Sequence, residues 1–178
     1  MEPIQSNKIY PIGIQNFEKM RKGGYFYVDK TALVYRLVKT GSYYFLSRPR
    51  RFGKSLLIST LEAYFQGKKE LFEGLAMEKL EKDWIKRPVL HIDLNIGKYD
   101  TPDSLDKQLE KAVTEWEQLY GTGMAESTLA LRFAGVVRRA CEQTGQRVAI
   151  LIDEYDKPML QAIGNEALQN EYRSTLKA

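Results

Sequence analysis

The sequence is poor in the two residue types that carry most zinc, redox and general-base chemistry. Its 178 residues include one cysteine, Cys141, and one histidine, His91. An intramolecular disulfide is therefore excluded, and a zinc site built from cysteine and histidine is nearly excluded. A Ser-His-Asp triad would need His91 as its base. We expect a structural role for this histidine because it lies in the middle of an apolar run.

Long apolar runs, an export signal and a strong charge imbalance are lacking as well. The longest purely apolar run covers residues 148–152, whereas a membrane-spanning helix needs about 20 residues. The first eight residues lack the basic region and apolar core of a signal peptide. We therefore expect a cytoplasmic protein without membrane contact. The net charge of +4 permits contact with phosphates but does not by itself indicate nucleic-acid binding.

Apolar strands and amphipathic helices alternate along the chain. Strands separated by helices are typical of α/β proteins with a parallel sheet. Asp29 is placed to cap the second of the expected helices. We expect strands over residues 42–47, 89–94 and 147–152, and helices over 14–22, 30–39, 54–66, 101–120, 126–144 and from 166 onwards.

A basic loop between the first expected strand and the helix that follows matches the end of the phosphate-binding pattern GxxxxGK[ST]. Gly53 lets the backbone approach a phosphate oxygen, Lys54 supplies a charge for the β- and γ-phosphates, and the Ser55 hydroxyl can hold Mg²⁺. The pattern departs at its first position, where Arg48 replaces glycine, and a basic surface turn remains the alternative. The candidate phosphate-binding residues are Arg50, Arg51, Phe52, Gly53, Lys54, Ser55 and Leu56.

Two adjacent carboxylates follow the apolar strand at 147–152. Ligands of open parallel sheets bind beyond the carboxyl ends of the strands. Asp153 is therefore the candidate Mg²⁺ ligand, together with Ser55, and Glu154 is the candidate base or orienting group for an attacking water. A solvated acidic turn is the alternative. Asp93 ends the preceding strand and could face the same site, although acids at strand ends are often structural.

The order of the two motifs along the chain predicts a site for a nucleoside triphosphate, with Lys54 and Glu154 as the catalytic residues. Four segments resemble the prokaryotic AAA-ATPase-like family of predicted P-loop ATPases. The resemblance implies an α/β P-loop NTPase fold, a three-layer sandwich with a mostly parallel sheet, ATP as the nucleotide and Mg²⁺ as cofactor. The segments are residues 11–17, 27–31, 47–55 and 151–158.

Roles for the remaining residues of these segments are less specific. Arg50 and Arg51 match family positions, where they would touch phosphates, form a partner surface or remain solvated. The segment 29–31 would lie near the adenine, or Asp29 would simply cap a helix. The pair Arg138-Arg139 reads as a solvated helix face.

The resemblance also implies that this chain is the N-terminal portion of a longer protein. We expect a helical lead-in over 1–41 and an ATPase core over 42–178 that is truncated before the sensor strand and lid, and is inactive as such a fragment. Family members often continue into a C-terminal nuclease-like domain of the PD-(D/E)XK type, which would bring nucleic acid as a partner. A homo-oligomer is a further expectation.

Two other functions stay open. A regulatory module that binds ATP without hydrolysing it is suggested by Arg48 in place of the first glycine. A nucleic-acid-associated defence or processing component is permitted by the basic residues of the loop and by Arg138 and Arg139. Physiological substrate, pathway and oligomeric state are not determined by the sequence.

Overall fold

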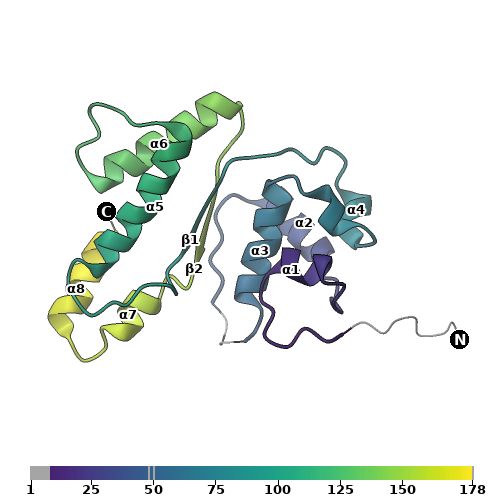
Figure 1. Cartoon of the computed structure of the whole chain (residues 1–178), viewed down its shortest axis with the longest axis horizontal. Coiled ribbons are helices and arrows are strands. Elements are labelled where there is room, and N and C mark those ends of the chain that lie inside the picture. Colours follow the sequence, from purple (N-terminus) through teal and green to yellow (C-terminus); the bar gives the residue numbers. More distant parts are fainter. Residues whose placement is uncertain (1–8, 48, 50, 178) are drawn as a thin grey trace, which may run out of the picture. The chain divides into compact units, whose positions relative to one another are not determined.

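The computed structural model describes residues 9–47, 49 and 51–177. The chain divides into two units, Met1–Lys86 and Arg87–Ala178, each with its own elements (Figure 1). The domain boundary expected after residue 41 falls inside the first unit and stays a prediction.

The first unit is built from short helices around an aromatic core. The rings of Phe17 and Phe72 are 5.0 Å apart, and those of Phe72 and Trp84 are 5.1 Å apart. Phe17 and Phe72 are completely buried, so burial of aromatic surface holds the unit together. Its elements are α1 (Phe17–Lys22), α2 (Thr31–Thr40), α3 (Lys54–Phe65), the 3-10 turn η1 (Lys69–Phe72) and α4 (Ala76–Leu80).

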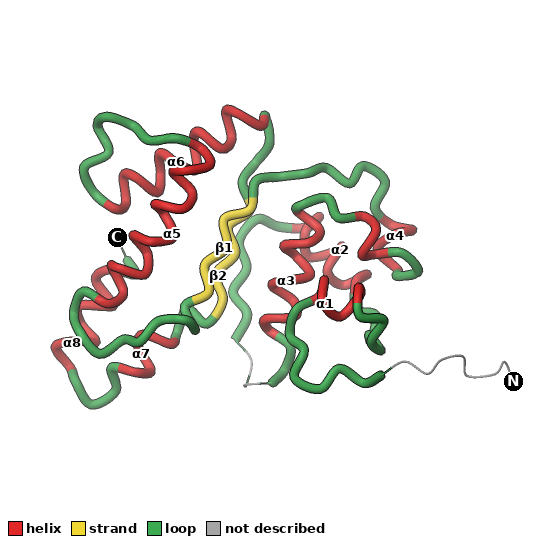
Figure 2. The backbone as a smooth tube through the Cα atoms, in the orientation of Figure 1, coloured by secondary structure: helices red, strands yellow, loops and turns green. Residues whose placement is uncertain are grey.

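The expectation of a buried strand over residues 42–47 is wrong. The described part of the first unit contains no strand, and Figure 2 draws strands only at β1 and β2 of the second unit. The side chains of Tyr43 and Phe45 are 96% and 69% exposed. A strand requires a neighbour that pairs with its backbone, and an apolar composition does not supply one. The Tyr44 hydroxyl instead donates to the Leu37 carbonyl of α2 at 2.7 Å.

The second unit contains a parallel pair of strands, which confirms the α/β class expected from the sequence. Strand β1 (Val89–Asp93) pairs with β2 (Ala149–Asp153) in a register that places Asp93 opposite Asp153. The crossover between them contains α5 (Ser104–Tyr120) and α6 (Leu129–Thr144), as a parallel connection requires. Two further helices, α7 (Lys157–Gln161) and α8 (Glu166–Thr175), follow β2.

The core of the second unit lies between β1 and its helices. Leu90 and Ile92 of β1 and Leu94 directly after it are all buried, in agreement with the two-residue period of a strand. Helix α5 packs against β1, α6 and α8 (Figure 1). Trp116 of α5 and Tyr172 of α8 belong to the same cluster of buried side chains.

Helices α5 and α6 begin three residues later than the sequence pattern indicates, and helix α7 was not expected. The Ser104 hydroxyl donates to the Thr101 carbonyl at 2.5 Å, so a local turn takes residues 101–103 out of α5. The Thr128 hydroxyl accepts the Leu131 N–H at 3.3 Å and caps α6. The five-residue α7 was not predicted.

None of the helices in the described part of the chain is long and apolar enough to cross a bilayer.

Glu81 is a buried carboxylate that ties the end of α4 to the rest of the first unit. Its side chain is only 3% exposed. It accepts the Tyr64 hydroxyl at 2.5 Å, the Lys39 ammonium at 2.9 Å, and the backbone N–H groups of Lys82 and Asp83. Burial acts to raise the pKa of this carboxyl, but the bonds from Tyr64, Lys39 and Asp83 outweigh it and lower the pKa from 4.5 to about 2.

Replacing Glu81 with glutamine is therefore expected to destabilise the protein by about 1–3 kcal/mol at pH 7, because it leaves buried donors without their charged acceptor. A carboxyl with a lowered pKa stabilises the fold above its unfolded pKa of 4.5, and this contribution is lost as the pH falls from 4.5 towards 2. The difference from wild type should thus shrink at pH 3. Urea unfolding at both pH values, with exposed Glu73→Gln as control, tests this. Equal midpoints at pH 7 would contradict it.

Candidate nucleotide-binding site

The predicted phosphate loop contains two residues with left-handed backbone conformation. Arg51 has φ 68° and Gly53 has φ 78°, while Phe52 between them does not have a positive φ. A positive φ is uncommon for a residue with a side chain. Alternating backbone handedness turns successive N–H groups toward one side, which is the arrangement that binds anions in phosphate loops. Arg48 and Arg50 lie outside the described residues.

Helix α3 begins directly after this turn, at Lys54. Gly53 precedes it without a side-chain cap, and the first backbone bond runs from the Leu57 N–H to the Gly53 carbonyl at 3.0 Å. The amides of Ser55 and Leu56 therefore precede the first helical bond, at the positive end of the helix dipole. A Cβ added at Gly53 would meet nothing within 4 Å. No described atom therefore crowds the space beside Gly53.

Segments far away in sequence hold α3 in place. The Phe17 N–H donates to the Ser59 hydroxyl at 2.9 Å, and that hydroxyl in turn donates to the Leu56 carbonyl at 3.0 Å. The Phe17 ring packs edge-on against Tyr27, with centroids 5.3 Å apart. The segments 11–17 and 27–31, which carry part of the family resemblance, thus contribute residues that support the phosphate-loop helix.

The Asp29 carboxylate accepts the first backbone N–H of two helices, α2 and α4. One of its carboxylate oxygens accepts the Thr31 N–H at 2.8 Å, and the other accepts the Ala76 N–H at 2.7 Å. Burial acts to raise the pKa of this carboxyl, but the bonds from Thr31 and Ala76 lower it. Asp29 thus accepts the first N–H of α2, as a cap would, from the position before the N-cap residue Lys30. The contact of residues 29–31 with adenine stays untested.

The acidic pair lies at the carboxyl end of β2, as predicted. Asp153 is 7% exposed, and its Oδ1 accepts the Glu154 N–H at 3.0 Å. Glu154 has φ 53°, a left-handed conformation that costs about 1–2 kcal/mol for a residue with a side chain. The described residues include three such non-glycine positions, of which Arg51 and Glu154 belong to the two predicted motifs. Strained backbone of this kind clusters at functional sites.

The strand register adds Asp93 to this edge of the sheet. Asp93 lies opposite Asp153, and neighbouring strands are about 4.8 Å apart. The Leu94 N–H donates to the Asp153 carbonyl at 3.1 Å, and the Asn95 N–H donates to Asp93 Oδ1 at 2.8 Å. The sequence does not determine whether Asp93 faces the site, because its place beside the acidic pair depends on the strand register.

The two residues predicted to hold Mg²⁺, Ser55 and Asp153, lie in different units of the chain. Among the described residues, no group of three or more His, Cys, Asp or Glu side chains could hold a metal by themselves. Mg²⁺ usually takes one or two carboxylates and completes its shell with substrate phosphates and water. The Ser55 hydroxyl and the Asp153 carboxylate are oxygen donors of the required kind. The loop belongs to the first unit and the acidic pair to the second.

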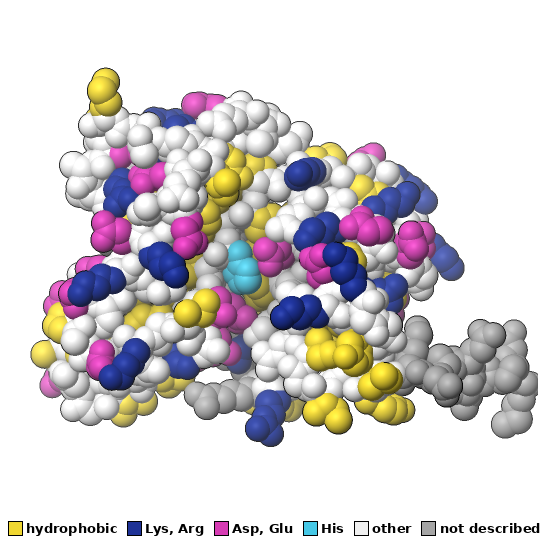
Figure 3. All heavy atoms as spheres, viewed as in Figure 1, with side chains coloured by type: hydrophobic (Ala, Val, Ile, Leu, Met, Phe, Trp, Pro, Cys, Tyr) yellow, Lys and Arg dark blue, Asp and Glu magenta, His cyan; other side chains and the backbone are white. Residues whose placement is uncertain are grey.

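Of the pair Arg138-Arg139 on α6, Arg138 is solvated as expected, with a side chain that is 67% exposed, whereas Arg139 is not. Glu126 accepts two hydrogen bonds from Arg139, whose side chain is 14% exposed. Arg138 lies 3.6 Å from the same carboxylate. These arginines therefore hold the loop before α6 against the helix. On the face drawn in Figure 3, basic and acidic side chains are interspersed over each unit, which does not favour a nucleic-acid surface there.

Comparison with known proteins assigns the family. The sequence profile of the AAA-ATPase-like family, described as a predicted AAA-ATPase, matches residues 11–178. The chain therefore belongs to this family, and the resemblance noted in the sequence is confirmed. An uncharacterized protein in the vnfD 5′ region of Azotobacter chroococcum mcd 1 is 41% identical over 174 residues, which cover 97% of this chain and 34% of that protein. The chain thus spans about a third of that relative's length. No solved structure gives a significant match.

Proposed function

We propose that this chain binds ATP with Mg²⁺ and hydrolyses it as part of a P-loop ATPase. The observation that carries the proposal is the turn at residues 51–53, which has left-handed residues and opens into the uncapped N-terminus of α3. Such a turn supplies backbone donors and a positive helix end for phosphate oxygens. Lys54 and Ser55 follow at the first positions of the helix.

Each proposed site residue has one chemical role. Lys54 neutralises charge on the β- and γ-phosphates, and the amides of residues 51–56 donate to phosphate oxygens. Ser55 and Asp153 are the residues that would hold Mg²⁺, and the ion would supply positive charge for the phosphate oxygens. Glu154 orients the attacking water and accepts its proton. Arg50 and Arg51 are proposed as additional phosphate contacts.

The finer fold and the partners belong to the same proposal. A three-layer P-loop NTPase sandwich is supported by the parallel pairing of β1 and β2 and by the acid at the carboxyl end of β2. We further propose that the ATPase works in the cytoplasm and is coupled to a partner or a nuclease-like domain. Nucleic-acid contact through such a domain and homo-oligomer formation are proposals at the same level.

A Mg²⁺ titration of ATP turnover by the whole protein tests the proposal. Removing Mg²⁺ with EDTA should abolish turnover. Ser55→Ala should raise the Mg²⁺ concentration for half-maximal turnover about tenfold, equivalent to about 1.4 kcal/mol. Exposed Ser174→Ala is the matched control. Turnover that persists in EDTA would contradict the metal role, and a protein that does not bind ATP would refute the proposal.

Two other outcomes of the same measurements identify the alternative functions. Tight Mg·ATP binding without turnover would indicate the regulatory module suggested by Arg48. A salt-sensitive shift with DNA or RNA would support the nucleic-acid-associated component.

A further inference from the structure

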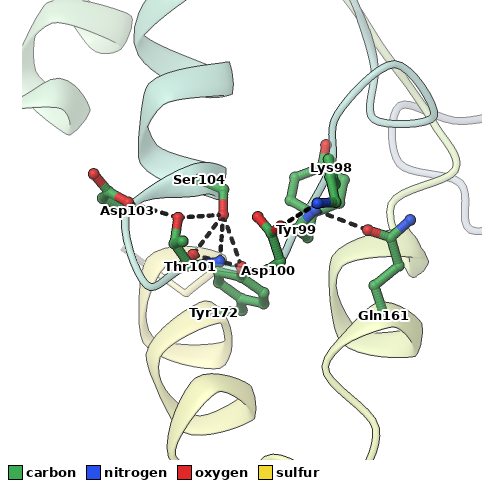
Figure 4. Close-up of polar contacts among 8 residues, drawn as sticks. All are labelled: Lys98, Tyr99, Asp100, Thr101, Asp103, Ser104, Gln161 and Tyr172. Atoms are coloured by element: carbon green, nitrogen blue, oxygen red, sulfur yellow. Dashed lines mark hydrogen bonds and ion pairs between the residues drawn. The ribbon is translucent and has the colours of Figure 1, made fainter.

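Helix α7, which follows the acidic pair, is attached at two points to the loop that follows β1. The Lys157 ammonium donates to Asn95 Oδ1 at 2.6 Å. One helical turn later, Gln161 Oε1 accepts the Tyr99 N–H at 2.8 Å (Figure 4). We call these two hydrogen bonds the α7 latch. Both lie within the second unit, and neither follows from a sequence pattern.

The loop that receives the latch is itself firmly held. Tyr99 is 1% exposed, and its hydroxyl donates to the Leu94 carbonyl at 2.8 Å. Burial and the nearby Asp93 carboxylate raise the pKa of Tyr99 to about 12, so the hydroxyl keeps its proton at neutral pH. The Tyr172 hydroxyl of α8 donates to the Thr101 carbonyl at 2.7 Å (Figure 4). A loop anchored in this way can act as a fixed support.

The latch closes a hydrogen-bonded ring that includes the backbone of the acidic pair. The Leu94 N–H donates to the Asp153 carbonyl at 3.1 Å, and the Lys157 N–H donates to the Glu154 carbonyl at 2.9 Å. The Lys157 side chain then returns to Asn95, next to Leu94. Glu154 is thus a member of a ring that is tied to the loop after β1 at Leu94 and at Asn95.

We propose that the α7 latch positions Glu154 for its reaction, and that Asn95, Lys157 and Gln161 are positioning residues. This inference rests on the proposed ATPase function. A left-handed residue with a side chain persists only where its surroundings over-determine it. The five residues of α7 do not form a stable helix by themselves. The latch supplies the missing constraint from outside the helix.

Two matched pairs of variants in the whole protein test the latch. Lys157→Met removes the hydrogen-bond donor and Gln161→Met removes the acceptor, while both keep most of the side-chain volume. Lys157→Arg keeps the donor, and Gln161→Glu keeps the acceptor. We expect each Met variant to lower kcat about tenfold, because small misplacements of a reacting group reduce rates strongly. KM for ATP should change less than about twofold, because Glu154 acts on water and not on the nucleotide. The Arg and Glu variants should retain most of the turnover.

Amide hydrogen exchange gives a second readout that does not depend on turnover. In the nucleotide-free protein, both Met variants should increase exchange over residues 153–161 and leave exchange over α1 and α2 unchanged. Lys157 forms its latch bond at an exposed position, so Lys157→Met is expected to fold even if Gln161→Met does not.

The outcomes separate the latch from the proposed function. Unchanged exchange together with unchanged kcat in the Lys157→Met variant would overturn the latch. Increased exchange with full kcat would also overturn it. So would a loss of kcat that the Lys157→Arg and Gln161→Glu variants share. A wild-type protein without ATP turnover would refute the proposed ATPase. Hydrogen exchange would then still test whether the latch holds the Glu154 turn. Increased exchange over residues 153–161 in the Met variants would support the latch, and unchanged exchange would overturn it.

Discussion

Replacing Glu154 with glutamine is expected to leave Mg·ATP binding intact while lowering kcat by about 10²–10⁴-fold, the usual effect of losing a general base. Glutamine has nearly the same shape as glutamate and can adopt the same left-handed backbone, but it does not accept a proton from water. The neighbouring Asp153 is unchanged in this variant, so the proposed metal ligand remains. Binding and turnover should therefore separate.

Equilibrium binding of a fluorescent ATP analogue and single-turnover hydrolysis measure the two effects on the same preparation. The exposed carboxylate of Glu171 on α8 provides the control, since Glu171→Gln makes the same chemical change away from the acidic pair. If Glu154→Gln hydrolysed ATP at the wild-type rate, Glu154 would not be the base. If it bound ATP about a hundredfold more weakly, its proposed role would have to move from water to the nucleotide.

Replacing Lys54 with alanine is expected to weaken ATP binding at least about a hundredfold, which corresponds to about 2.7 kcal/mol. Lys54 is the first residue of α3 and the proposed point charge for the β- and γ-phosphates. Its loss removes the positive charge and leaves the backbone donors of the loop in place. Some affinity for the phosphates should therefore remain at low salt.

Titration calorimetry with Mg·ATP and with Mg·ADP provides the measurement. Lys79→Ala, which removes an exposed lysine from α4, is the matched control. The loss should be larger for ATP than for ADP, because the γ-phosphate is absent from ADP. Wild-type affinity in the Lys54→Ala variant would contradict the nucleotide site altogether and leave the loop as a basic surface turn.

The outcomes of these two variants also distinguish the proposed ATPase from its alternatives. A regulatory module would lose ATP with Lys54→Ala but would show no turnover for Glu154→Gln to reduce. A nucleic-acid component would respond to salt and to loss of loop arginines. Arg139 is not available for that role, because its guanidinium is bound to Glu126 within the second unit.

The sequence by itself determined the elements whose signal is local. The parallel strands at 89–93 and 149–153 and the helix after Gly53 were predicted close to their observed bounds, because periodicity, glycine and caps act over a few residues. The family and the two motifs were also evident from the residues alone. The strand at 42–47 was not determined in this way, since a strand exists only with a partner for its backbone.

Only the tertiary structure decided the contacts between residues far apart in sequence. The register that places Asp93 opposite Asp153, and the bonds that tie Lys157 and Gln161 to the loop after β1, depend on how two distant segments pair. The tertiary structure likewise decided the left-handed conformations of Arg51 and Glu154. Neither residue type prefers this conformation, so the surrounding fold imposes it, and no local pattern in the sequence records that constraint.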